Sequence, residues 1–309
     1  MKSMTTQKKA IVTGSSGFVG RALVKRLEKE GYHVVTYSRS KGQDILNRED
    51  LVKAAKGCDL FFHLAAELEE DKPLEHLRNV NVKGTSNALW AARENHCERF
   101  IFLSSVGVYG RFDDQAHEMF PYNPTTNYEL SKKEAEELVM SHSKDQDTVV
   151  VRSALVMGPN KYWKEIVKTI QKGFPIIGSG HNKWQIVYLD DLVDAIVFLA
   201  KHKKATGIYN VAEEPTQAQT LRQLVELIHA QTKSKKEITH IPVWLGKGIA
   251  HGMTLLFTMQ GKKTILRPEY VDRLLKNRHY SIEKIKALGW KPKTTTIKAI
   301  EKTLEGLRD

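Results

Sequence analysis

Residues 8–37 have the sequence KKAIVTGSSGFVGRALVKRLEKEGYHVVTY, and this stretch decides the fold. Residues 8–14 form a short run, rich in β-branched side chains and ending in glycine, that is typical of a buried strand. Apolar side chains recur at helical spacing over residues 18–30, and Gly31 stands where a helix would end. A second β-branched run follows at residues 33–37. A strand, a helix and a strand joined by short turns predict a right-handed unit with parallel strands.

The same alternation continues along the first half of the chain. Apolar runs predict further strands at residues 59–66, 99–105 and 148–156. Helical spacing predicts helices between them, at about 74–95 and 128–143. Parallel strands joined by helices form a sheet that is covered on both faces. The expected fold class is therefore α/β, a doubly wound parallel sheet of the Rossmann type.

The turn between the first strand and the first helix holds the most informative motif. Its sequence is TGSSGFVG, residues 13–20, with glycines at 14, 17 and 20. Glycine permits a tight turn and a close approach to a pyrophosphate, and the N–H groups that begin the helix then face the anion. A dinucleotide is therefore the expected ligand. The residues expected to hold it in this turn are Thr13, Gly14, Ser16, Gly17, Phe18, Val19 and Gly20.

The end of the second strand indicates which dinucleotide is preferred. A carboxylate at this place would hold a ribose 2′-hydroxyl, but the chain has Ser38 and Arg39 there. A hydroxyl followed by a guanidinium accommodates a 2′-phosphate. NADP is therefore the expected cofactor, and NAD stays an alternative in which Arg39 stacks on the adenine or faces solvent.

After residue 156 the alternation becomes looser, which divides the chain into two expected parts. Residues 5–156 are expected to form the dinucleotide-binding domain, and residues 157–309 a smaller, mostly helical substrate lobe. A strand at 207–212 is expected to return to the main sheet. The helices expected in the second part lie at 160–172, 190–202, 217–232 and 295–307.

The composition excludes several classes of protein. With 309 residues, of which 41% are hydrophobic and 27% charged, the chain is long and apolar enough for a sizeable core. Cys58 and Cys97 lie far apart, so a disulfide scaffold and a cysteine zinc site are excluded. The histidines show no metal-binding spacing, so no metal is expected. With no secretory signal and no run of about 20 apolar residues, we expect a cytoplasmic protein.

The net charge of +12 does not by itself predict a nucleic-acid partner. The basic side chains alternate with glutamates along the helices, as in Lys25-Arg26-Leu27-Glu28-Lys29-Glu30, and they do not cluster with aromatic residues. The expected partner is a small-molecule substrate and no nucleic acid. Attraction of the basic surface to anionic ligands or to a membrane stays open.

Three side chains form a candidate catalytic group. Tyr128 and Lys132 are four residues apart in YELSK at the start of a predicted helix, so both lie on one helix face. Ser105 closes the predicted strand RFIFLSS, at the carboxyl edge of the sheet where ligands bind in this architecture. Ser104 is a weaker candidate for the same role.

Together these motifs resemble those of the extended short-chain dehydrogenase/reductase superfamily, the NAD(P)-dependent epimerase/dehydratase type. The resemblance covers almost the whole chain. The stretches that carry it are TGSSGFVG (13–20), DLFFHLAA (59–66), NVNVKGT (79–85), LSSVGVYG (103–110), YELSK (128–132), IVYLDDLVDAI (186–196) and LGWKP (288–292).

The resemblance implies a role for each residue of the site. Tyr128 would be the general acid/base, and Lys132 would bind the nicotinamide ribose and lower the pKa of the tyrosine. Ser105 would hydrogen-bond the substrate oxygen, and Asn81 would support the site. Further cofactor contacts would come from Asp44 and Ile45 at the adenine and from Leu64, Ala65 and Ala66 along the cofactor path.

Other side chains have weaker assignments. Glu67, Tyr109, Trp163 and Trp184 are candidate substrate contacts, although simple packing explains the two tryptophans equally well. His63 lies between apolar residues in a predicted strand. We interpret it as part of the core or of the cofactor wall, and not as a base.

Departures from the family pattern narrow the expected reaction. Dehydratases of this type carry an acidic residue just after the catalytic serine or threonine, but Val106 and Gly107 stand there. The C-terminal region looks like that of 3β-hydroxysteroid dehydrogenases and dihydroflavonol reductases. The expected activity is therefore an NAD(P)-dependent oxidoreductase that interconverts an alcohol and a ketone or aldehyde on a small apolar substrate. The alternatives are a nucleotide-sugar epimerase and a non-catalytic NADP-binding regulator.

The apolar run at 241–259, IPVWLGKGIAHGMTLLFTM, has three interpretations. It packs as core, it forms a wall of an apolar substrate pocket, or it rests on a membrane face. In the third case Lys262 and Lys263, just beyond the run, would meet anionic headgroups. The segment is too short and too polar to cross a bilayer. A homodimer is a further open expectation.

Overall fold

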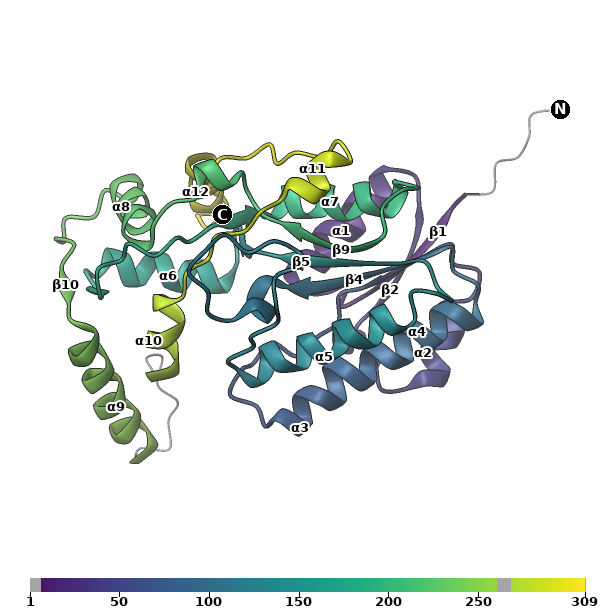
Figure 1. Cartoon of the computed structure of the whole chain (residues 1–309), viewed down its shortest axis with the longest axis horizontal. Helices are drawn as coiled ribbons and strands as arrows, with labels where there is room; N and C mark the ends of the chain where they lie inside the picture. The colour runs from purple at the N-terminus through teal and green to yellow at the C-terminus, as the bar shows by residue number, and fades with distance from the viewer. Residues whose placement is uncertain (1–6, 260–267, 309) are drawn as a thin grey trace.

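The computed structural model describes residues 7–259 and 268–308 of the chain. Six parallel strands form one sheet in the order β2-β1-β3-β4-β5-β9 (Figure 1). This confirms the doubly wound α/β fold. The strands are β1 (Lys9–Thr13), β2 (His33–Tyr37), β3 (Leu60–His63), β4 (Arg99–Ser105), β5 (Thr148–Ser153) and β9 (Gly207–Val211).

Helices cover both faces of this sheet. Because side chains alternate along a strand, Ile11 and Phe61 pack into one apolar core, and Val12 and Phe62 pack into the other. Burial on both faces explains why β5 has six buried residues in a row. The first layer consists of α2 (Arg48–Ala54), α4 (Gly84–Glu94) and α5 (Asn127–Ser141), and the second of α1 (Phe18–Lys29), α7 (Leu189–Lys201) and α11 (Glu283–Ala287).

The helix expected at 74–95 is not uniform. It begins as α3 (Leu74–Leu77), continues as the π-helical segment η2 (Arg78–Lys83) and ends as α4. A π-helical turn changes the direction in which side chains leave the helix and is frequent at functional sites. Here it holds the buried Asn81. Three short 3₁₀ turns complete this description: η1 (Arg39–Lys41), η3 (Val106–Tyr109) and η4 (Pro215–Gln217).

The smaller lobe is built on two short parallel strand pairs. The strand expected at 148–156 divides, so that its end becomes β6 (Leu155–Met157), which pairs with β8 (Ile186–Tyr188). The second pair is β7 (Ile176–Ile177) with β10 (His240–Ile241). The helices of the lobe are α6 (Lys161–Gln171), α8 (Leu221–Gln231), α9 (Val243–Met259), α10 (Pro268–Leu275) and α12 (Thr296–Gly306).

The two parts of the molecule are not separated at a single position. The expected strand at 207–212 is β9, which pairs with β5 at the edge of the main sheet. Helices α7 and α11 also lie beyond residue 156 in the chain but cover the main sheet. The segment 157–309 therefore contributes to both parts.

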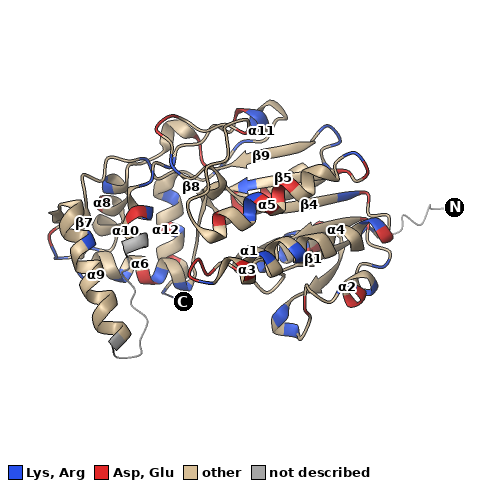
Figure 2. Ribbon diagram, turned by 60° about the horizontal axis from the view of Figure 1, so that its bottom comes forward, with Lys and Arg blue, Asp and Glu red and all other residues tan. Residues whose placement is uncertain are grey.

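Charged residues of both signs are mixed over most of the helices, whereas α9 contains almost none (Figure 2). The mixing is what the alternation of Lys, Arg and Glu along the sequence predicts. Among the described residues, no helix combines the length and the apolar character needed to cross a bilayer.

Candidate active site

The turn after β1 has the geometry of a phosphate-binding loop. Gly14 has a φ of +70°, and a Cβ there would lie 2.8 Å from the backbone of Leu64 and Ala65. A Cβ on Gly20 would lie 2.2 Å from the carbonyl oxygen of Gly14. The turn therefore packs so closely against β3 and α1 that it needs glycine at both positions.

Two features of this turn suit an anion. Helix α1 begins after Gly17, and no side chain caps its first N–H groups. The hydroxyl of Ser15 is buried and has no hydrogen-bond partner in the structure. Free helix N–H groups together with an unpartnered hydroxyl fit the pyrophosphate of a dinucleotide. Sequence reasoning missed Ser15, because the pattern GSSG does not distinguish its two serines.

His63 closes β3 and is fully buried. Its ring lies between the hydroxyls of Thr13 and Thr85, with Nδ1 2.7 Å from the first oxygen and Nε2 3.0 Å from the second. Burial lowers the pKa of His63 to about 3, so the ring is neutral. A neutral imidazole with both nitrogens in hydrogen bonds has a structural role. This agrees with the interpretation of His63 as part of the core or of the cofactor wall.

The residues predicted to contact the adenine end of the cofactor lie in different settings. Ser38 is buried, whereas the Arg39 side chain is 86% exposed and reaches to 3.7 Å from the carboxylate of Glu67. Asp44 is exposed, and Ile45 is buried against Gly84 of α4. Ser38, Arg39 and Glu67 therefore lie near one another, with the guanidinium open to solvent.

The two neighbouring serines at the end of β4 face different surroundings. Ser104 donates a hydrogen bond to the buried carboxylate of Glu136. Ser105 is half-buried, and its Oγ accepts a hydrogen bond of 3.0 Å from the N–H of Gly107. Because Ser104 is engaged in the core, Ser105 is the serine that remains available at the carboxyl edge of the sheet.

Tyr128 and Lys132 lie on consecutive turns at the start of α5, which the side chain of Thr126 caps. The ammonium of Lys132 donates a hydrogen bond of 2.8 Å to the Leu103 carbonyl and lies 4.1 Å from the ring centroid of Phe102. Burial lowers the pKa of Lys132 to about 7. Lys132 is therefore held against the end of β4, beside the serines.

The phenol of Tyr128 has its pKa raised, first by burial and then by the carboxylate of Glu70. The cation that opposes this rise is Arg273 of α10, whose guanidinium lies 3.1 Å from the Glu70 carboxylate. Lowering of this pKa by Lys132 stays a prediction, and Arg273 of the smaller lobe is a further cation that acts in that direction.

Asn81 connects the site to the loop after β3. Its amide oxygen accepts a hydrogen bond of 2.8 Å from the N–H of Glu67, and its amide nitrogen donates to Ser131 of α5 at 2.9 Å. The amide also donates to the Glu67 carbonyl at 3.1 Å. Asn81 thus holds this loop against the helix that carries Tyr128 and Lys132, which is a supporting role.

A second ion pair, made by the residue that follows α10, lies beside the site. Lys276 is 2.6 Å from the carboxylate of Glu129, and both side chains are buried. Glu129 also accepts a hydrogen bond of 2.8 Å from the N–H of Thr125. Sequence reasoning missed Glu70, Arg273 and Lys276, since α10 carries no recognisable motif and its distance along the chain hides its proximity to α5.

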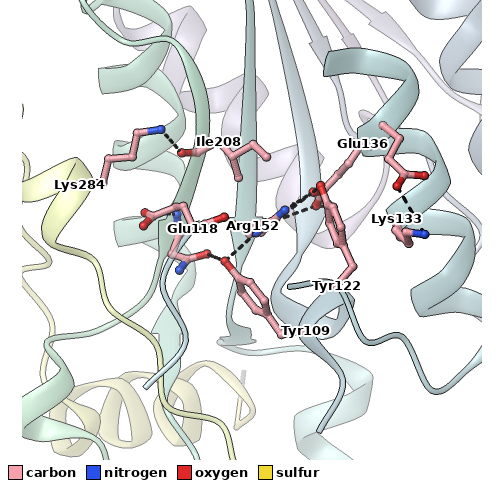
Figure 3. A network of polar contacts seen from close by, with 11 residues as sticks. Tyr109, Glu118, Tyr122, Lys133, Glu136, Arg152, Ile208 and Lys284 are labelled. Carbon is pink, nitrogen blue, oxygen red and sulfur yellow. Dashed lines mark hydrogen bonds and ion pairs between the residues drawn. The ribbon is translucent and has the colours of Figure 1, made fainter. Parts of the chain in front are cut away.

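Beneath the site lies a buried polar network (Figure 3). Arg152 of β5 contacts Glu136 of α5 at 2.7 Å, and the two side chains are 1% and 0% exposed. Arg152 also donates a hydrogen bond of 2.7 Å to the hydroxyl of Tyr109, and Tyr122 donates to Glu136 at 3.0 Å. Tyr109, a candidate substrate contact, is fully buried in this network and supports the core instead.

The two tryptophans proposed as substrate contacts also lie in a core. Trp163 is 1% exposed and donates to the Val156 carbonyl at 2.7 Å, and Trp184 is 5% exposed and donates to the Leu274 carbonyl at 3.3 Å. Both belong to the apolar cluster of the smaller lobe. This corresponds to the packing alternative.

Curated proteins of known name match almost the whole chain. Over 96% of its length, the chain is 28% identical to 94% of the N-acetyl-alpha-D-glucosaminyl-diphospho-ditrans,octacis-undecaprenol 4-epimerase of Escherichia coli O157:H7. It is 25% identical to the 3-beta-hydroxysteroid dehydrogenase of Mycolicibacterium neoaurum, over 96% of the chain and 90% of that protein.

Solved structures share the fold and include both cofactor types. RMD from Pseudomonas aeruginosa complexed with NADPH is 21% identical, with a TM-score of 0.75 over 97% of this chain and 99% of that one. A UDP-glucuronic acid 4-epimerase from Bacillus cereus in complex with NAD is 20% identical, with a TM-score of 0.78 over 97% and 98%.

A family model gives the assignment. It matches residues 10–212, which include the glycine turn, Ser105, Tyr128 and Lys132. Relatives that match almost the whole chain bear the names of epimerases, dehydratases and dehydrogenases. Two of the similar solved structures hold NADPH or NAD. The chain belongs to the NAD dependent epimerase/dehydratase family, the extended short-chain dehydrogenase/reductase type of enzyme.

Proposed function

We propose that this enzyme is an NAD(P)-dependent oxidoreductase that interconverts a secondary alcohol and a ketone. The observation that carries the proposal is the placement of Tyr128 and Lys132 on consecutive turns of α5, beside Ser105 at the end of β4. The carboxyl edge of this sheet is also where the glycine turn would place a dinucleotide.

Each side chain of the site has a separate role when the alcohol is oxidised. The phenolate oxygen of Tyr128 takes the hydroxyl proton while the carbon that bears the hydroxyl gives up a hydride. Ser105 donates a hydrogen bond to the same oxygen as charge develops there. A nicotinamide dinucleotide held at the glycine turn would supply the hydride acceptor, and in reduction the same side chains would act in reverse. Because burial raises the pKa of Tyr128, a nearby cation such as Arg273 helps the phenol to lose its proton.

Replacing Tyr128 by phenylalanine tests the proposal. Loss of a positioned acid/base costs roughly 10²–10⁴ in rate, so Tyr128→Phe should lose nearly all turnover while NADPH affinity changes only a few-fold. Tyr162→Phe, at an exposed tyrosine of α6, is the matched control and should keep wild-type turnover. Near wild-type turnover in Tyr128→Phe would contradict the assignment.

We infer that NADP is preferred over NAD, on the basis of Ser38 and the open guanidinium of Arg39. Calorimetric titration should show tighter binding of NADPH than of NADH, and the difference should shrink in high salt and in Arg39→Ala. The carboxylate of Glu67 lies near enough to compete for the guanidinium. Equal affinities of the wild type for both nucleotides would refute the preference.

One observation favours a second candidate, epimerisation of a sugar carried on a diphosphate. The groups that face Tyr128 from α10 and the loop after β3 are Arg273 and Glu70, a cation and an anion and not an apolar wall. A guanidinium is the side chain that best binds a diphosphate. The Escherichia coli relative acts, by its name, on a sugar joined to a lipid through a diphosphate.

Cofactor turnover separates the two candidates. An oxidoreductase consumes one NADPH for each ketone reduced, over many turnovers. An epimerase returns the hydride to the same substrate, so the absorbance of the cofactor is unchanged after each cycle. Stoichiometric loss of NADPH with apolar ketones supports the first candidate, whereas interconversion of sugar epimers without net loss supports the second.

Dehydration is not proposed. The residues after Ser105 are Val106 and Gly107, and the nearest carboxylate to Gly107 belongs to Glu129. That carboxylate is already bound by Lys276 and Thr125. No free acid therefore stands beside Ser105, among the residues that the structure describes, to protonate a leaving hydroxyl.

A further inference from the structure

Helix α9 presents an apolar face that the described part of the chain leaves uncovered. Eleven large hydrophobic side chains are exposed among the described residues, and five of them lie on this one helix. They are Trp244 (73% exposed), Leu255 (65%), Leu256 (59%), Ile249 (41%) and Leu245 (37%). Single exposed apolar residues are ordinary, but a contiguous apolar face marks an interaction site.

The opposite side of α9 fixes its orientation. Gly246 lies so close to β7 that a Cβ there would be 2.7 Å from Ile177, and Ala250 is fully buried with Val271 of α10. Lys247 forms an ion pair of 3.0 Å with Asp272 of α10. Helix α9 is therefore anchored along one side, and Figure 1 shows it projecting from the smaller lobe together with α10.

The net charge of the sequence on both sides of α9 indicates the kind of partner. Residues 233–267 contain seven Lys and Arg residues and a single acidic one, Glu237. This segment alone therefore supplies about half of the net charge of +12 of the chain. Helix α9 itself contains no acidic residue. An apolar face in a basic segment complements an anionic lipid surface, which offers apolar depth below negative headgroups.

We propose that α9 docks this enzyme on an anionic phospholipid bilayer, lying in the plane of the interface. With 17 residues, the helix is about 26 Å long at 1.5 Å per residue, which is shorter than a spanning helix. Its exposed apolar side chains occur at both ends: Trp244 lies near the N-terminal end of the helix, and Leu255 and Leu256 lie near its C-terminal end. The whole face can therefore enter the headgroup region at once.

Docking would place the catalytic site near the lipid. Helix α9 packs on α10, and α10 carries Arg273, which pairs with Glu70 beside Tyr128. A substrate that dissolves in the bilayer would therefore lie one helix away from the site. The docking proposal itself does not depend on the proposed reaction, because lipid binding is measured without turnover.

Co-sedimentation with vesicles tests the docking. The full chain should sediment with phosphatidylcholine vesicles that contain phosphatidylglycerol, less with pure phosphatidylcholine, and less in high salt. In the double variant Trp244→Glu and Leu255→Glu, partition should fall about tenfold or more. Ile297→Glu, an exposed isoleucine of α12, is the matched control and should partition as the wild type does.

Tryptophan fluorescence gives a second measurement that requires no charged substitution. Trp163, Trp184 and Trp290 are buried, so Trp244 should supply most of any blue shift on addition of vesicles. Trp244→Phe should abolish that shift, and Trp90→Phe, at the 49% exposed tryptophan of α4, should keep it.

Two results would overturn the proposal. One is wild-type protein that stays in the supernatant with anionic vesicles at low salt. The other is a concentration-dependent dimer that the Trp244→Glu and Leu255→Glu variant disrupts, with vesicle binding absent or unchanged, since the face would then bind a second copy of the chain. Lys262 and Lys263, which were expected to meet headgroups, lie outside the described residues.

Discussion

Burial in the folded protein disfavours the charged form of Lys132. The lysine is 2% exposed, and burial lowers its pKa from 10.5 to about 7. The unfolded chain keeps the ordinary pKa, so below pH 7 folding must bury a charge that prefers water. Above about pH 10.5 both states are neutral and this cost is gone.

The pH dependence of stability should therefore reveal Lys132. A pKa difference costs about 1.4 kcal/mol per unit, so Lys132→Met should be more stable than the wild type by a few kcal/mol at pH 7. This difference in the free energy of unfolding should shrink as the pH rises toward 10, because removing the proton from Lys132 on folding costs less as the pH approaches the ordinary pKa of lysine. Urea unfolding at several pH values measures this.

The neighbouring lysine supplies the control for that experiment. Lys133 is partly exposed and forms an ion pair of 3.4 Å with Glu137 one turn along α5. Lys133→Met should change stability little and show no such pH dependence. If Lys132→Met were less stable than the wild type at pH 7, the buried ammonium would be a net stabiliser and the argument would fail. In either case Lys132→Met should bind NADPH more weakly.

At the scale of the element, the turn between β1 and α1 combines stability with binding. In Gly20→Ala the new Cβ would meet the Gly14 carbonyl at 2.2 Å, so the turn must move away from the geometry that faces the pyrophosphate. We expect NADPH affinity to fall by a factor of about 10² or more, together with a loss of stability of a few kcal/mol.

A second glycine separates these two effects. Gly31, after α1, has a φ of +85° and open space around it. Gly31→Ala should therefore cost about 1–2 kcal/mol of conformational strain and leave NADPH binding unchanged. Calorimetry with NADPH and thermal melting of both variants make the comparison. Unchanged NADPH affinity in Gly20→Ala would mean that the turn does not hold the cofactor.

The packing of α5 against β5 depends on the buried ion pair between Glu136 and Arg152. Glu136→Gln would leave the Arg152 guanidinium buried without its anion, and breaking such a pair costs about 3–5 kcal/mol. Glu137→Gln, next in sequence but exposed, should cost less than about 1 kcal/mol. The loss in free energy of unfolding, measured in urea, should therefore be several times larger for Glu136→Gln than for Glu137→Gln. Equal small losses would show that the network in Figure 3 contributes little to stability.

Some elements and site residues could be predicted from the sequence, and others could not. Strands such as 99–105 were predictable because burial on both faces demands a continuous apolar run. The glycine turn, Ser105, Tyr128 and Lys132 follow from local spacing. Arg273 and Glu70 meet only through the packing of α10 against the first domain, and no local pattern records such a contact. Tyr109 was misjudged because its position after the serine says nothing about its burial.

At the scale of the whole molecule, the two parts are tied together by buried carboxylates. Glu213, just after β9, accepts hydrogen bonds from the N–H of Ile186 in β8 and from the hydroxyl of Thr296 in α12. Asp191 of α7 accepts a hydrogen bond of 2.8 Å from the N–H of Thr294. Glu213 and Asp191 thus join the main sheet to the smaller lobe. We therefore expect the lobe not to fold independently of the sheet.

The full chain should therefore unfold as one unit, and cofactor should stabilise all of it. NADPH at a hundred times its dissociation constant should add about 2.7 kcal/mol, seen as a rise of a few degrees in the melting temperature. Circular dichroism follows the whole molecule, and fluorescence of the double variant Trp90→Phe and Trp290→Phe follows the tryptophans of the smaller lobe, namely Trp163, Trp184 and Trp244. Both signals should change at one temperature, and NADPH should raise that temperature, whereas the same NADPH concentration should raise it only slightly in Gly20→Ala. A separate fluorescence transition that ignores NADPH would mean that the lobe folds on its own, and that the contacts of Glu213 and Asp191 do not couple it to the sheet.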